Sequence, residues 1–123
     1  ASLSRTVVEQ AINLSGSPVV LADDLEMGAL GEWGDLPDRV ISAIHARNHG
    51  LLICNACDRI EEIATHLRET AEADPTVAAR LPEMNARMGT LTRDLHQKAA
   101  AVPAPDDETV EQLWEQARRE ATL

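Results

Sequence analysis

Aromatic side chains are almost missing from this sequence: it contains no Phe, no Tyr and only two Trp. Clusters of aromatic and β-branched residues, which are typical of strands, are correspondingly scarce. Alanine and leucine, which favour helices, are abundant. The composition therefore argues against an all-β protein and predicts an all-α fold.

Positive charge is also scarce, with 11 basic residues against 21 acidic ones and a net charge of −10. The acids gather at the ends: residues 1–35 carry six acids and one base, and residues 103–123 carry six acids and two bases. Nucleic acids and anionic membranes attract clustered Lys and Arg, so we expect no nucleic-acid partner and no membrane partner. The acidic surface fits either a basic protein partner or simple solvation.

Long apolar runs and cysteines are few as well. No segment approaches the ~20 apolar residues that span a bilayer. The two cysteines, Cys54 and Cys57, do not make a disulfide framework, so we expect reduced thiols and a cytoplasmic location. Ten of the eleven basic residues are Arg, which suits a GC-rich bacterial genome.

A length of 123 residues predicts a single helical domain, 1–123. Its first part, 1–35, contains a helix over 4–14 and a Gly-rich loop. The segment 18–30 fits either a helix that starts at its proline or a short extended stretch. Trp33 lies in the loop, where it serves either as a plug or as a partner-binding anchor.

The middle part, 36–102, has the pattern of a helical hairpin. Asp35 has the side chain and position of a helix N-cap, and we expect one continuous helix over about 36–73. Its apolar stripe changes face at Gly50, so a break there is the alternative. A second helix is expected over 75–102. Together with shorter N- and C-terminal helices they predict a helical bundle built on a long antiparallel hairpin, completed within one chain or as a homodimer.

The last part, 103–123, predicts a linker followed by a helix over about 107–121. Its apolar residues recur at helical spacing, which predicts that they face inward. These residues are Val110, Leu113, Trp114 and Ala117.

A histidine and two cysteines lie close together in the sequence His49-Gly-Leu-Leu-Ile-Cys54-Asn-Ala-Cys57. Zinc binds His nitrogen and Cys thiolate in a tetrahedron. The segment resembles the His and Cys-x-x-Cys core of zinc-binding anti-sigma factors, with one more residue between His49 and Cys54. The resemblance implies a zinc site at His49, Cys54 and Cys57. The alternative is that both cysteines pack as small apolar residues in the core.

The segment His45-Ala-Arg-Asn-His-Gly-Leu-Leu is similar to the phospho-accepting helix of histidine kinases and phosphotransferases. Those proteins pair helical hairpins into four-helix bundles. The resemblance implies a phosphorelay domain in which His45 accepts phosphate, with Arg47 and Asn48 beside it. The alternative is that His45 and His49 are partly exposed polar residues on a helix.

Enzyme signatures are missing: the sequence has no glycine-rich phosphate loop, no Gly-x-Ser-x-Gly and no His-Glu-x-x-His. We therefore assign no catalytic residue and favour a non-enzymatic helical protein that acts through protein–protein contacts. Such a protein would be an adaptor, a chaperone or a regulatory subunit. The alternatives are histidine phosphotransfer through His45 and zinc-dependent regulation near Cys54 and Cys57.

Overall fold

The computed structural model describes residues 2–14, 16 and 18–120. The chain divides into two compact units, Ala1–Thr92 and Arg93–Leu123, each of which is described here by itself. The prediction of a single domain over 1–123 stays a prediction.

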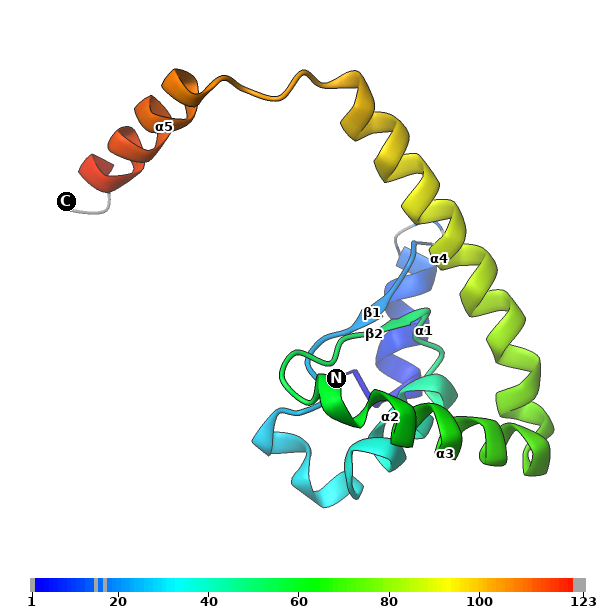
Figure 1. Cartoon of the computed structure of the whole chain (residues 1–123). Helices are drawn as coiled ribbons and strands as arrows, with labels where there is room; N and C mark the ends of the chain where they lie inside the picture. Colours follow the sequence, from blue (N-terminus) through cyan, green and yellow to red (C-terminus); the bar gives the residue numbers. More distant parts are fainter. Residues whose placement is uncertain (1, 15, 17, 121–123) are drawn as a thin grey trace. The chain divides into compact units, whose positions relative to one another are not determined.

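Helices make up most of the chain, which confirms the all-α class (Figure 1). Short β1 and β2 are the strands among the described residues, and η1 and η2 are 3-10 helices. In chain order the elements are α1 Arg5–Leu14, β1 Leu21–Ala22, η1 Gly28–Trp33, α2 Leu36–His45, β2 Gly50–Leu51, η2 Cys57–Arg59, α3 Ile60–Ala73, α4 Pro75–Ala101 and α5 Asp107–Glu120.

The two strands form a parallel pair, with α2 in the connection between them (Figure 1). Leu21 is paired with Gly50, and Ala22 with Leu51. The pairing continues past β1, because the Leu25 amide donates to the Leu52 carbonyl at 3.1 Å. Of the two alternatives for 18–30, the structure therefore has the extended stretch.

The expected continuous helix over 36–73 is wrong. Helix α2 ends at His45, and α3 begins only at Ile60. Arg47 adopts the left-handed conformation (φ 76°), which ends a helix. A Cβ on Gly50 would lie 2.5 Å from Leu21 Cδ2, so glycine allows β2 to approach β1 closely. The change of face in the apolar stripe at Gly50 therefore marks a true break.

The start of α2 and the turn between α3 and α4 follow the sequence pattern. Asp35 and Asp38 form a reciprocal capping box at the N-terminus of α2. The Asp74 carboxylate accepts a hydrogen bond from the Thr76 amide at 2.7 Å at the start of α4. The hairpin is thus present, with a first arm that is limited to α3. Helix α4 runs through Pro82 without interruption.

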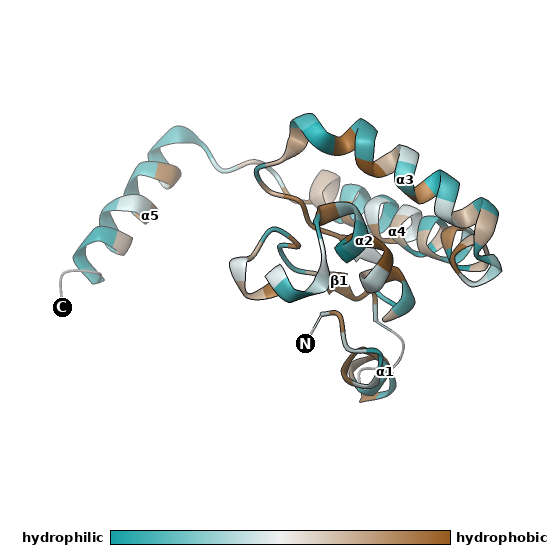
Figure 2. Cartoon of the chain, turned by 90° about the horizontal axis from the view of Figure 1, so that it is seen from below, coloured by the Kyte–Doolittle hydropathy of each residue, from teal (hydrophilic) through white to brown (hydrophobic). Residues whose placement is uncertain are grey.

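The core of the first unit is built mainly on α2 and on the segment after β1. In Figure 2, hydrophobic stretches gather around α2 and β1, whereas α3 alternates between hydrophilic and hydrophobic bands as an amphipathic helix does. The buried apolar residues are Leu3, Ala22, Leu25, Leu36, Val40, Ala43, Ile44, Ile63 and Val77.

Helix α5 has nearly the expected bounds. Val110, Leu113 and Trp114 expose 37%, 57% and 60% of their surface within their own unit, and their burial against the rest of the chain stays a prediction. Nothing else among residues 93–120 covers this face, because all residues from Asp94 to Glu120 are exposed. No helix in the described part of the chain is long and apolar enough to cross a membrane.

Candidate functional site

Acidic side chains gather where the two parallel strands end. Asp23, Asp24 and Glu26 follow β1, and the loop Cys54–Ala56 follows β2. Parallel strands bring their carboxyl ends to the same edge of a sheet, which is where α/β proteins place their binding sites. We call these residues the strand-end cluster.

Glu26 ties the two loops of the strand-end cluster together. Its Oε2 accepts hydrogen bonds from the amides of Cys54 (2.6 Å) and Asn55 (2.7 Å), and its Oε1 accepts one from Ala56 (2.8 Å). These bonds, that of Asn55 first, lower the pKa of the Glu26 carboxyl although desolvation opposes them. Glu26 is therefore an ionised positioning residue.

The other two carboxylates of the cluster each accept one backbone amide and differ in their exposure. Asp24 Oδ1 accepts the Glu26 amide at 3.0 Å, which shapes the turn after β1. Asp23 is exposed and accepts only the neighbouring Asp24 amide, at 2.9 Å. No cation among the described residues forms an ion pair with it. Asp23 is thus the carboxylate of the cluster that is most open to a ligand.

Cys54 and Cys57 are free and exposed, so the expectation that they pack in the core is wrong. Desolvation, followed by the charges of Asp24 and Glu26, raises the pKa of the Cys54 thiol, which disfavours the thiolate that metals bind. The described residues contain no group of three or more His, Cys, Asp or Glu side chains able to hold a metal ion. A zinc site at His49, Cys54 and Cys57 stays a prediction and would need a further ligand.

His49 is buried, with 2% of its surface exposed, so the expectation of a partly exposed helical residue is wrong for it. It precedes β2, and its Nδ1 accepts a hydrogen bond from the Val20 amide at 3.0 Å. Its Nε2 lies 3.9 Å from Glu83 Oε1 on α4. The ring therefore serves as an acceptor that joins the segments before β1 and β2.

We expect His49 to make the fold sensitive to mild acid. Desolvation, reinforced by the charges of Arg87 and Arg80 and opposed by Glu83, lowers the pKa of His49 below 6.5. As the pH falls through about 6.5, the unfolded chain binds a proton that the folded chain does not, and stability drops. Urea unfolding from pH 7.5 to 5 should show this drop in the wild type.

His49→Gln, which does not titrate, should flatten that pH dependence even if it lowers stability overall. His96→Gln is the matched control, because His96 lies on the exposed part of α4. An unchanged slope in His49→Gln, or a flattened one in His96→Gln, would contradict the assignment.

His45 is the last residue of α2, with its side chain 43% exposed and its Nε2 3.3 Å from Asp74 Oδ2. Its expected neighbours are engaged elsewhere: Arg47 contacts Glu9 at 3.4 Å, and the buried Asn48 donates to the carbonyls of Ser2 and Ala43. Arg47 and His45 do line one hollow of about 110 Å³. Phosphorylation of His45 stays a prediction.

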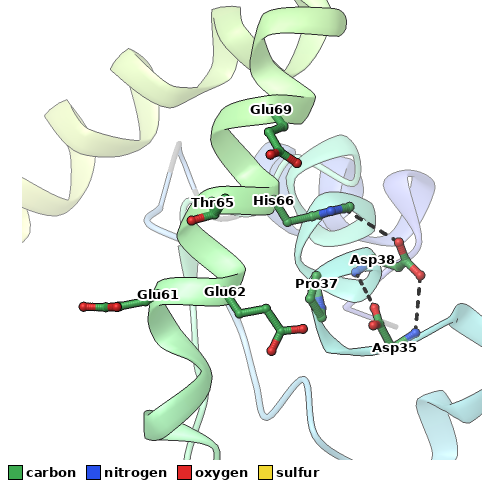
Figure 3. Close-up of a pocket in the computed structure, with 8 residues that line it drawn as sticks. All are labelled: Asp35, Pro37, Asp38, Glu61, Glu62, Thr65, His66 and Glu69. Carbon is green, nitrogen blue, oxygen red and sulfur yellow. Dashed lines mark hydrogen bonds and ion pairs between the residues drawn. The ribbon is translucent and has the colours of Figure 1, made fainter.

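A larger hollow, of about 490 Å³, lies between the start of α2 and α3 (Figure 3). His66 points across it toward Asp38, at 3.8 Å, while Glu61 points away from α2. Three of its five carboxylates already have structural roles, because Asp35 and Asp38 cap α2 and Glu62 pairs with Arg59. The lining residues are Asp35, Pro37, Asp38, Glu61, Glu62, Thr65, His66 and Glu69.

Trp33, the predicted partner-binding residue, lies at the end of η1 with 49% of its surface exposed. Its exposure is unusual for a tryptophan but leaves both sequence interpretations open. The sequence analysis missed the strand-end cluster. The available signal was Val19-Val20-Leu21 followed within five residues by three acids.

Comparison with known proteins shows a similarity over part of the chain. The chain is 32% identical over 81 residues to a protein of Methylobacillus flagellatus named beta-hexosaminidase. The aligned residues make up 66% of this chain but 22% of that protein, so the chain spans about a fifth of its relative. No family model matches the chain, and no solved structure matches it.

Proposed function

We propose that this chain carries a carboxylate of a glycoside hydrolase site that acts on β-linked hexosaminides, with Asp23 in that role. The observation that carries the proposal is the open carboxylate at the end of β1, in a chain similar to a protein named beta-hexosaminidase. The proposal concerns one part of a site, because the aligned residues make up only 22% of that relative.

The chemistry of glycoside cleavage explains the choice of Asp23. Most glycosidases use two carboxyl groups, one as acid and one as nucleophile or base. The second group needs an oxygen that faces the sugar or an attacking water. Both oxygens of Glu26 accept backbone amides. Asp23 and Asp24 each accept one amide through Oδ1, and Asp23 is the more exposed of the two. Glu26 would hold the adjoining loop in place.

Hydrolysis of a chromogenic N-acetyl-β-hexosaminide and NMR titration with N-acetylglucosamine test this proposal. We expect the sugar to shift amide signals at residues 23–26, and Asp23→Asn to lower any hydrolysis rate by at least about a hundredfold with little change in Tm. Glu26→Gln is the matched control, because it should lower Tm as well. Neither hydrolysis nor sugar-dependent shifts in the wild type, or full activity in Asp23→Asn, would refute the proposal.

A second candidate is the non-enzymatic role: an adaptor, chaperone or regulatory subunit with a protein partner. It is favoured by the exposure of both tryptophans, Trp33 and Trp114, since aromatic residues are frequent anchors of interfaces. The free thiols of Cys54 and Cys57 favour a cytoplasmic setting. A cross-linked partner that is lost with Trp33→Ala but kept with Leu14→Ala, an apolar site that is more exposed than Trp33 (85% against 49%), would support the role of Trp33. Equal capture by both variants would count against it.

A further inference from the structure

Helix α5 carries an apolar row that no other residue of its unit covers. Leu113 and Trp114, at the middle of the helix, expose 57% and 60% of their surface. Val110 and Ala117 lie one turn before and one turn after them on the same face. The row is therefore four residues long and centred on the helix.

The opposite face of α5 is held by pairs of polar side chains four residues apart. Gln112 donates to Glu108 (3.3 Å) and Arg119 to Glu115 (3.1 Å) on this face, and Gln116 donates to Glu120 (2.9 Å) on one flank of the row. Such pairs add only a few tenths of a kcal/mol each in general, and an isolated helix of this length is marginal in water. Most of its stability must then come from contacts of the apolar row.

The charges of α5 differ between its two ends. Asp107, Glu108 and Glu111 make its first half acidic, whereas Arg118 and Arg119 balance Glu115 and Glu120 in its second half. Two such helices in parallel bring acidic half against acidic half, whereas in antiparallel orientation each acidic half meets a balanced half. The charges of the helix therefore favour antiparallel over parallel pairing with itself.

We propose that α5 pairs with α5 of a second copy of this chain, in antiparallel orientation, through the row at 110, 113, 114 and 117. At 100° per residue, Glu111 and Arg118 lie on the same flank of this row. Antiparallel pairing places each Glu111 opposite Arg118 of the other copy, twice by symmetry. Parallel pairing would instead bring this flank against the uncharged Thr109 and Gln116.

The expected dimer is weak. A helix of this length is about 21 Å long, and one such pair buries less than the ~800 Å² per partner of a standard interface. We expect a Kd on the order of 10–100 μM. This inference does not depend on the hydrolase proposal. If the chain acts through protein contacts, as in the second candidate role, the apolar row of α5 is the surface through which it associates with itself. Sugar binding tests the hydrolase proposal and the molecular mass in solution tests the dimer, so a failure of one proposal is distinguishable from a failure of the other.

Sedimentation equilibrium of the whole chain from about 5 to 500 μM tests the dimer. The mass should rise from the 13.4 kDa of the monomer toward twice that value. Leu113→Ser should weaken association at least about thirtyfold, and Gln112→Ser, on the opposite face, should leave it unchanged. A monomer at all concentrations would overturn the proposal. A dimer that Leu113→Ser does not weaken would do so too.

Exchange of the flanking charges tests the orientation. Glu111→Arg and Arg118→Glu should each weaken self-association, and an equimolar mixture of the two variants should restore it, because each substituted charge then meets its opposite. Weakening without rescue in the mixture would exclude antiparallel pairing. In a Trp33→Phe variant, Trp114 is the source of the tryptophan fluorescence. If a quencher cannot reach Trp114 at any protein concentration, α5 is folded onto its own chain, and this result would refute the dimer.

Discussion

Replacement of Arg80 by alanine should lower the free energy of unfolding by about 2–4 kcal/mol. Arg80 lies on α4 and is 9% exposed. Its Nη2 donates to the carbonyls of Arg47 (3.1 Å) and Asn48 (3.2 Å), and its Nη1 pairs with Glu83. Alanine would leave both carbonyls without this donor in a buried setting, and would release α4 from the turn that ends α2. Urea unfolding at pH 7.5 measures the loss.

Arg59→Ala is the matched control for Arg80→Ala. Arg59 forms an equally good ion pair with Glu62, at 2.8 and 2.9 Å, but on the surface. Water and salt screen such pairs, so we expect no change beyond the error of the measurement. If the two variants lose the same stability, the contacts of Arg80 with the turn do not matter to the fold.

Replacement of Leu25 by alanine should cost about 2–5 kcal/mol. The Leu25 side chain is fully buried in the core, although it lies in a short connection between β1 and η1. Its amide donates to Leu52, and its carbonyl accepts from Arg39 Nη1 at 3.1 Å. These backbone contacts hold the segment in place, so the cavity left by Leu25→Ala cannot collapse freely.

The control for Leu25→Ala is Leu14→Ala, at the end of α1. Leu14 is 85% exposed, and surface substitutions of this kind usually change stability by less than about 0.5 kcal/mol. A loss of stability in Leu25→Ala no larger than that in Leu14→Ala would show that the loop after β1 is not part of the core.

Helix ends were predictable because the signals for them are local. The capping box of Asp35 and Asp38, the turn at Asp74 and the start of α5 at Asp107 each depend on side chains within about three residues of the backbone that they cap. The all-α class was predictable for a similar reason, since helix propensity is summed along the chain. The apolar stripe also changed face at Gly50, which lies in the break between α2 and α3.

The strand-end cluster was not predictable in this way. In the sequence, Glu26 is indistinguishable from an ordinary surface acid. Only the approach of residues 54–56 in the fold makes it an acceptor for three amides. His49 likewise has the sequence context of a helix, but its Nδ1 meets the amide of Val20, 29 residues earlier. Neither of these two long-range contacts produces a periodic pattern in the sequence.

The sequence by itself determined the helical class, the caps of α2 and α4, the turn between α3 and α4, and the acidic surface, because these follow from local propensity and charge. The tertiary structure alone decided that α2 stops at His45, that β1 and β2 pair, and that Asp23 is exposed while both oxygens of Glu26 accept backbone amides. The physical reason is burial. Ending α2 early costs helical hydrogen bonds, and this cost is offset by the strand pairing, the contacts of Arg80 with the carbonyls of Arg47 and Asn48, and the burial of Leu25 and Ile44.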